Sequence, residues 1–455
     1  MIHKTAKIIT ELQPHQKAAL LAALKGNKIL AHSTGSGKTL TAIAIADALN
    51  QPTTVLTPAS LVTNFQKELR KHKKGGPKIN VLSLPTAVER NLPIAPGSTL
   101  IIDEIHSLRN ADTKRNKYVK ALADKAGRVY GLTATPIYND PQDMAQLANV
   151  VSNGLAFTQG IKPYIRERKI PASWLDKLLY GMQDGVTYEI AHREALKKLL
   201  RNYVDVFEKD IEKPQRIDEL VKVPMSEKQL RVYQYVTSKL PRDLREKIRK
   251  NMPPSKSEAR TLNAFFSGAR QTSNTTEAFD IEGEASPKLK AAAGNLVKMF
   301  AANPKTRALV YSNYLTSGID SYGKLLEKAG IPYNKFNGSM SPKEKQKVVD
   351  QYNSGEVPVI LGSGSASEGL DLKDTRLIQI LEPHFNESKI DQVIGRGIRY
   401  KSHEDLPPEE RNVTVQRYLS TIPKSNDTSI DEYLYNRAKD KQKIGLAIQK
   451  MLTEN

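Results

Sequence analysis

The sequence predicts an α/β protein in which two parallel-sheet blocks flank a helical insert. Short apolar runs alternate with helical stretches up to about residue 150, disappear between about 151 and 285, and return near Ser286. In the middle region, Tyr188–Tyr203 and Ser226–Leu240 read as helices with charge on one side and Leu, Val or Tyr on the other. We therefore expect domains at 1–150, 151–285 and 286–455.

Composition limits the classes of function. The 455 residues include 69 Lys and Arg against 49 Asp and Glu, giving a net charge of +20. This excess favours a polyanionic partner, with nucleic acid first, while a charge that serves only solubility is the alternative. The absence of cysteine excludes disulfides, thiol catalysis and cysteine-ligated zinc. There is no secretory signal and no apolar run of membrane length, so we expect a cytoplasmic, intracellular protein without membrane contact.

The first block contains a glycine-rich turn between a strand and a helix. The strands expected here are Lys28–Ala31, Thr53–Thr57, Thr99–Asp103 and Arg128–Thr133. The first leads into Thr34-Gly35-Ser36-Gly37-Lys38-Thr39, and an apolar helix follows. This order is typical of a phosphate-binding loop, where glycines admit phosphates to the backbone N–H groups, Lys38 supplies positive charge and the Thr39 hydroxyl ligates Mg²⁺. His32 stands where the strict pattern has glycine, and a purely structural turn is the alternative.

An acidic pair follows another apolar strand of the same block. Asp103 is expected to hold Mg²⁺, and Glu104 to orient and deprotonate the water that attacks the γ-phosphate. Thr133 and Thr135 follow a third strand and offer hydroxyls that can bond the acidic pair through His106. A Thr-rich turn before proline is otherwise only a turn.

The second block ends in paired arginines and a basic helical tail. Its expected strands are Arg307–Ser312, Val357–Gly362, Arg376–Leu381 and Val413–Leu419, and its tail helix is Ser429–Leu452. Arg396 and Arg399 are three residues apart, so on a helix they share one face and can reach a γ-phosphate bound by the first block. An exposed basic helix is the alternative.

Taken together, these motifs resemble those of superfamily 2 helicases and translocases. Leu12–Gln16 resembles the adenine-reading element, with Gln16 as the contact, and Thr34–Thr39 resembles the first motif, which in this family also lacks the leading glycine. Asp103–His106 resembles the DEAH-type second motif and departs from it at Ile105. The remaining matches are Thr133–Thr135, Ser365–Asp371 and Gln392–Arg399. The resemblance implies two RecA-like lobes that bind ATP and Mg²⁺, with Gly369 and Asp371 near the nucleotide and Gln392, Arg396 and Arg399 as catalytic residues.

Other stretches resemble particular branches of that superfamily. Pro58–Phe65, Gly268–Asn274 with Ser286–Leu289, and the tail Ser429–Lys443 resemble chromatin-remodelling-type translocases of duplex DNA. Leu381–Asn386 and Arg399–His403 are similar to helicase-like ATPases of large DNA viruses and phages. The nucleic-acid contacts implied by the resemblance are Pro58, Ser60, Asn64, Ser312, Asn313 and Ser365.

The sequence thus predicts an ATP hydrolase, stimulated by nucleic acid, that couples hydrolysis to translocation on DNA. DNA is favoured over RNA and duplex translocation over unwinding, since no long aromatic-tipped hairpin is evident between the later motifs. A strand-separating DNA or RNA helicase is one alternative, and a catalytically silent nucleic-acid-binding subunit is another. The expected protein partners belong to a viral or phage replication or transcription apparatus. Trp174, the single tryptophan, is expected to pack a helix.

Overall fold

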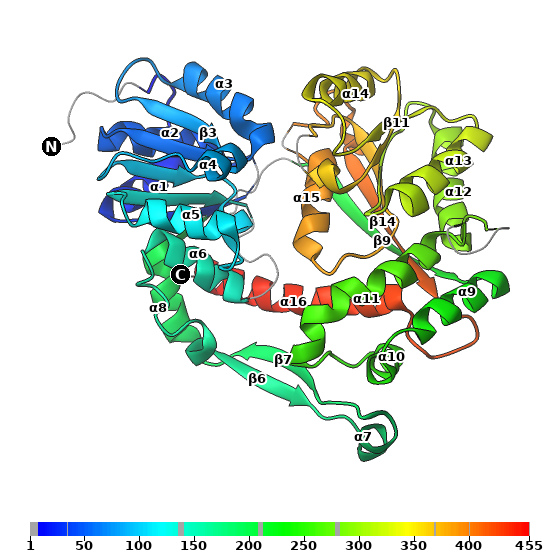
Figure 1. Ribbon diagram of the computed structural model, residues 1–455. Helices are drawn as coiled ribbons and strands as arrows, with labels where there is room; N and C mark the ends of the chain where they lie inside the picture. Colours follow the sequence, from blue (N-terminus) through cyan, green and yellow to red (C-terminus); the bar gives the residue numbers. More distant parts are fainter. Residues whose placement is uncertain are drawn as a thin grey trace. The chain divides into compact units, whose positions relative to one another are not determined.

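The computed structural model describes residues 8–33, 35–134, 141–207, 213–277, 283–367, 370–399 and 401–454. The chain forms two compact units (Figure 1). The first comprises residues 1–166, 189–211 and 441–455, and the second comprises residues 167–188 and 212–440.

The first unit is built on a six-stranded sheet with the order β3-β2-β4-β5-β1-β8, in which every pairing is parallel. The strands are β1 (Lys28–His32), β2 (Thr53–Thr57), β3 (Ile79–Ser83), β4 (Thr99–Ile102), β5 (Arg128–Thr133) and β8 (Val204–Phe207). The four strands expected from the sequence are therefore present, and β3 and β8 are added at the two edges.

Helices cover both faces of this sheet. They are α1 (Pro14–Lys25), α2 (Lys38–Leu49), α3 (Val62–His72), α4 (Leu84–Arg90), α5 (Lys114–Ala123), α6 (Pro141–Val151) and α8 (Arg193–Tyr203). Successive residues of β4 point to opposite faces, because Leu100 and Ile102 pack in one apolar cluster and Ile101 packs in the other. Burial on both faces explains why the strands are continuous apolar runs.

The second unit contains another all-parallel sheet, with the order β11-β12-β10-β13-β14-β9. Its strands are β9 (Gln215–Pro224), β10 (Arg307–Tyr311), β11 (Tyr333–Phe336), β12 (Val359–Gly362), β13 (Thr375–Ile380) and β14 (Asn412–Thr421). Its helices are α9 (Glu227–Ser238), α10 (Arg242–Arg249), α11 (Lys256–Asn274), α12 (Pro287–Ala302), α13 (Ser321–Lys328), α14 (Pro342–Ser354) and α15 (Glu387–Gly397). The expectation of two parallel-sheet lobes is confirmed.

The middle region contains strands that the sequence analysis did not predict. Between residues 151 and 285 lie β6 (Ile165–Ile170) and β7 (Gly185–Ile190), which form a two-stranded sheet, and the edge strands β8 and β9. The helix predicted at Tyr188–Tyr203 begins only at Arg193, since Tyr188 belongs to β7. The strands were missed because β6 and β9 are largely exposed and charged, as edge strands often are, and lack an apolar run.

The helical insert is shared between the two compact units and is not a unit of its own. The domain boundaries expected at residues 150 and 285 stay predictions. The tail forms one helix, α16 (Ile430–Thr453), whose first residues belong to the second unit and whose residues from Lys441 belong to the first. None of the described helices combines the length and hydropathy needed to cross a bilayer.

Candidate active site

The motifs of the first unit meet at one edge of its sheet. The glycine-rich turn follows β1, Pro58 follows β2, Asp103 follows β4 and Thr133 ends β5. All these strands are parallel, so their carboxyl ends lie at the same edge. In open parallel sheets this edge is where ligands bind.

The backbone of the glycine-rich turn requires glycine. Gly35 has φ 76° and Gly37 has φ 79°, which is the left-handed region that other residues avoid. A Cβ at Gly37 would also lie 2.4 Å from Nε2 of Gln16. Helix α2 begins directly afterwards at Lys38, so its N-terminal N–H groups open onto the turn. Thr34 lies outside the described residues.

Lys38 turns back over this loop. Its Nζ donates to the carbonyl oxygens of His32 at 2.8 Å and of Ser33 at 3.2 Å. Thr39 follows in the first turn of α2 and is half-buried. A helix N-terminus, two left-handed glycines and an ammonium group together fit a chain of phosphates.

Gln16 and its neighbour His15 fasten α1 to the same loop. His15 Nε2 lies 2.9 Å from the carbonyl oxygen of the buried residue Ser36, and Gln16 Nε2 donates to that oxygen at 3.3 Å. The His15 ring stacks on Phe207, with ring centroids 3.9 Å apart. His15 was not among the predicted site residues, although its position beside Gln16 was a usable signal.

Asp103 is held by the neighbouring strand. Thr57, at the end of β2, donates to Asp103 Oδ2 at 2.9 Å, and Glu104 N lies 3.1 Å from Oδ1. Burial, and then the charge of Glu104, raises the pKa of Asp103 to about 6, against the opposing effects of Thr57 and Lys38. A partly desolvated carboxylate with a second carboxylate beside it is a donor set suited to a divalent cation such as Mg²⁺. Thr57 was missed, although it ends the strand beside β4.

The acidic pair is linked to the third motif as expected. His106 Nδ1 lies 3.1 Å from Glu104 Oε2 and 3.2 Å from Thr133 Oγ1, while Thr135 lies outside the described residues. The departure from the DEAH pattern at Ile105 is accommodated by Gly131, because a Cβ there would lie 2.5 Å from Ile105 Cδ1.

Three predicted nucleic-acid contacts follow β2 in the first unit. Pro58 precedes a short 3₁₀ turn (Ala59–Leu61) that contains Ser60, Asn64 lies in the first turn of α3, and both Ser60 and Asn64 are exposed. They lie after a carboxyl end of the same sheet that carries the glycine-rich turn.

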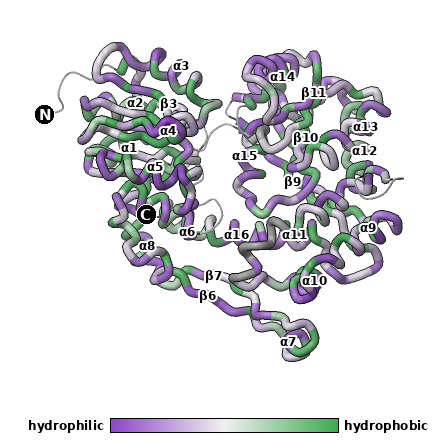
Figure 2. The backbone as a smooth tube through the Cα atoms, in the orientation of Figure 1, coloured by the Kyte–Doolittle hydropathy of each residue, from purple (hydrophilic) through white to green (hydrophobic). Residues whose placement is uncertain are grey.

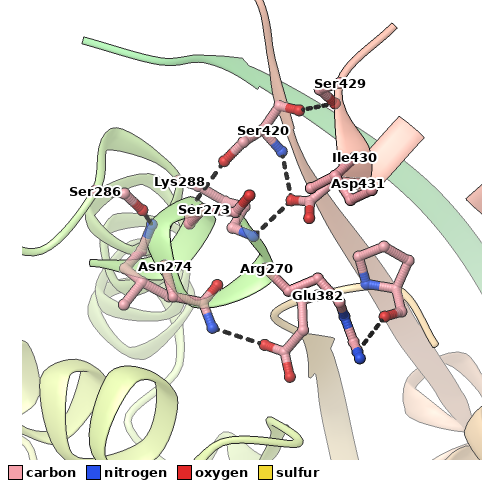
Figure 3. A network of polar contacts seen from close by, with 12 residues as sticks. Arg270, Ser273, Asn274, Ser286, Lys288, Glu382, Ser420, Ser429, Ile430 and Asp431 are labelled. Carbon is pink, nitrogen blue, oxygen red and sulfur yellow. Dashed lines mark hydrogen bonds and ion pairs between the residues drawn. The ribbon is translucent and has the colours of Figure 1, made fainter. Parts of the chain in front are cut away.

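The corresponding edge of the second sheet carries Ser312 and Asn313 after β10. Ser312 is fully buried, and its hydroxyl donates to Glu382 Oε1 at 3.0 Å. Asn313 donates to the same carboxylate from its backbone N–H and from Nδ2. Asn274 Nδ2 donates to Glu382 Oε2 at 2.9 Å, as Figure 3 shows. Glu382 therefore orients both predicted contacts, although the sequence analysis gave it no role. The Ser365 side chain lies outside the described residues.

A buried ion pair lies in the same network. Lys288 Nζ is 2.8 Å from Asp431 Oδ2, and both side chains are fully buried. Ser420 N donates to the same oxygen at 2.9 Å (Figure 3). The pair joins the first turn of α12 to the first turn of α16.

The two arginines do not share a helical face. Gln392 and Arg396 lie on α15, but that helix ends at Gly397, so Arg399 lies beyond it and the expectation of one shared helical face is wrong. The catalytic roles of these residues stay predictions. Ile398 has φ −120° and ψ 79°, which turns the chain out of the helix. Arg399 Nη1 instead pairs with Asp371 at 3.0 Å. Gly369 lies outside the described residues.

Two family models match the chain. The SNF2-related domain matches residues 87–278, and the helicase conserved C-terminal domain matches residues 291–401.

Viral proteins are also similar to the chain over most of its length. A protein of Acanthamoeba polyphaga mimivirus, designated an ATP-dependent RNA helicase, is 32% identical over 453 residues, with 95% of this chain and 94% of the relative covered. A second mimivirus protein with the same designation is 25% identical, covering 89% of this chain and 80% of the relative. An African swine fever virus protein, designated a termination factor NPH-I homolog, is 24% identical over 93% of this chain and 75% of the relative.

Proposed function

Because the chain belongs to the superfamily 2 helicases found in large DNA viruses, and is an ATP hydrolase of that family, we propose that it couples ATP hydrolysis to movement along duplex DNA. The observation that carries the proposal is the edge of the first sheet, where Lys38, the Asp103–Glu104 pair and Thr133 meet.

The first unit would bind the nucleotide and activate the water. Gly35, Ser36, Gly37 and Lys38 cradle the phosphates, and Thr39 and Asp103 hold Mg²⁺. Mg²⁺, when bound, neutralises charge on the reacting phosphates. Glu104 accepts the proton of the attacking water, and His106 fixes its carboxylate through the 3.1 Å contact.

The second unit would supply the remaining catalytic groups, Gln392, Arg396 and Arg399, with Asp371 orienting Arg399. We expect Lys38→Ala to weaken nucleotide binding and abolish hydrolysis. Arg399→Ala should leave binding largely intact and lower turnover by about 10³–10⁵-fold, the range for such arginines. Normal turnover in Arg399→Ala would contradict the catalytic role of Arg399.

Nucleic acid would contact the carboxyl edges of both sheets, through Pro58, Ser60 and Asn64 in one and Ser312, Asn313 and Ser365 in the other. Asn313 and Ser312 would act from a position fixed by Glu382. With a net charge of +20, binding should depend little on base sequence and fall steeply with salt. Tight binding to one sequence that survives high salt would contradict this mode.

Duplex translocation is favoured by the match to the SNF2-related domain and by the stretches that resemble duplex translocases. The relatives designated RNA helicases support the alternative of strand separation. The viral relatives support an intracellular setting in a host cell, with partners in viral replication or transcription.

The test compares ATPase rates with single-stranded DNA, duplex DNA and RNA across a salt series. We expect duplex DNA to stimulate at least as well as single strands. The protein should displace a triplex-forming strand from duplex DNA in an ATP-dependent way and leave a forked duplex mostly paired. Efficient fork separation, with stimulation only by single strands or RNA, would identify a conventional helicase.

A further inference from the structure

The helix α7 (Trp174–Tyr180), which joins β6 to β7, turns an apolar face to solvent. Trp174 is 70% exposed, and Leu175, Leu178 and Leu179 are 47%, 72% and 54% exposed. These positions recur at helical spacing, so they form one continuous surface. Figure 2 shows hydrophobic residues along α7. The expectation that Trp174 packs a helix is therefore wrong for this chain alone.

The opposite face of α7 is polar and is fastened to α10. Asp176 is buried and pairs with Lys250, and the Arg242 guanidinium lies 5.0 Å from the centre of the Tyr180 ring. A surface helix ordinarily buries its apolar stripe and exposes its polar side. In α7 this orientation is reversed.

The helix is also firmly held in this orientation. The Ser173 hydroxyl caps its N-terminus by accepting from Asp176 N at 3.1 Å, and Gly181 closes its C-terminus in the left-handed conformation. Asp184 accepts from Ala172 N at 3.1 Å and pairs with Lys177 at 2.9 Å. A short helix ordered by two caps and three ionic or aromatic contacts presents its apolar face at little further cost in entropy, as a docking surface does.

Charge indicates what covers this face. The arm, defined as residues 166–190, contains four Lys or Arg and four Asp or Glu, whereas the whole chain carries +20. Nucleic-acid sites concentrate cations, so the arm lacks the electrostatic character of one. Two copies of a chain with this net charge repel each other over most of their surfaces, but the arm is balanced and permits close approach.

We propose that the apolar face of α7 is a contact between two copies of this chain, in which the α7 helices pack against each other around a two-fold axis. Each face consists of four large apolar side chains and offers roughly 400 Å², so a symmetric pair buries roughly 800 Å². This is below the ~1,200 Å² of stable interfaces, so the dimer is weak and concentration-dependent.

Sedimentation of the nuclease-treated full chain tests the pairing directly. From about 1 to about 100 µM, the range for weak interfaces, we expect a shift from monomer to dimer. Trp174 is the single tryptophan, so its emission should move to shorter wavelength over the same range. High salt should preserve or strengthen the dimer, because it screens the repulsion between copies.

A matched pair of variants locates the contact. Leu178→Asp should raise the dissociation constant at least tenfold, whereas Leu155→Asp, at a leucine 73% exposed in the first unit, should not change it. Because the chain has no cysteine, Leu175→Cys should form a disulfide-linked dimer on oxidation and Leu155→Cys should not.

Several results would overturn the proposal. These are a monomer at all concentrations, a dimer that Leu178→Asp leaves unchanged, and a Trp174 emission that does not respond to protein concentration. A shift of that emission when duplex or single-stranded DNA is added to the monomer would assign the face to nucleic acid instead.

Discussion

Removing Asp431 should destabilise the second unit more than removing its buried partner Lys288. Lys288 lies in the first turn of α12, where the helix dipole is positive, so without Asp431 its ammonium is buried beside charge of the same sign. Asp431 lies in the first turn of α16, where the dipole favours a carboxylate, and it keeps the hydrogen bond from Ser420 N.

The expected magnitudes follow from this asymmetry. Breaking a fully buried ion pair costs about 3–5 kcal/mol, because one charge stays behind without its partner. We expect Asp431→Leu near the upper value and Lys288→Met near the lower one, since a remaining hydrogen bond to a charged group is worth about 1.5–3 kcal/mol. The double variant leaves no charge behind and should be within about 1 kcal/mol of the wild type.

Urea and thermal unfolding followed by circular dichroism measure these changes. For a unit of this size, each kcal/mol lowers Tm by about 2–4 °C. The control is Lys335→Met in the exposed pair with Asp320, at 2.6 Å, which should cost less than about 1 kcal/mol. Equal losses for Lys288→Met and Asp431→Leu, or a double variant as unstable as the sum of the two, would refute the reasoning.

Three further predictions concern catalysis, the glycine-rich turn and pH. Glu104→Gln should bind Mg²⁺-ATP but lower turnover by about 10²–10⁴-fold, as general-base loss does, in nucleotide-binding and single-turnover assays. Gly37→Ala should raise the KM for ATP, because the added Cβ would lie 2.4 Å from Gln16 Nε2. The further substitution Gln16→Ala should remove this clash but not the backbone strain of an alanine at a φ of 79°. Burial alone would raise the pKa of Glu258, but Lys247 and the N–H of Ser255 hold it below its ordinary value. The stability that this ionised carboxylate contributes is present above the ordinary glutamate pKa and is lost as the pH falls through the lowered pKa of Glu258. In Glu258→Gln, the free energy of unfolding should therefore fall less steeply as the solution is made acidic.

Much of the fold and of the first unit's site could be predicted from the sequence. A buried strand of a parallel sheet can be recognised in the sequence as an apolar run, and binding or catalytic residues directly after it lie at the carboxyl edge of the sheet. The positions of the glycine-rich turn and Asp103 therefore followed from local order alone. The link from Glu104 through His106 to Thr133 was also anticipated.

What was missed depends on tertiary context. Edge strands such as β9 carry exposed charged residues and show no apolar run. At the end of α15, a Cβ at Gly397 would lie 3.0 Å from Thr375 Cγ2, a tertiary contact that the local sequence does not reveal. The outward face of α7 depends on Lys250 and Arg242, which are distant in the sequence.

The path of α16 has a consequence for synthesis on the ribosome. Ile448 and Met451 are fully buried in the same apolar cluster as Ile29 of β1. This core therefore cannot close while the segment from residue 441 is still inside the exit tunnel. The N-terminal sheet must keep an apolar surface open until the segment from residue 441 has left the tunnel, and its folding is completed only then. We expect the nascent chain to depend on chaperones for this interval, and fragments that end before α16 to aggregate.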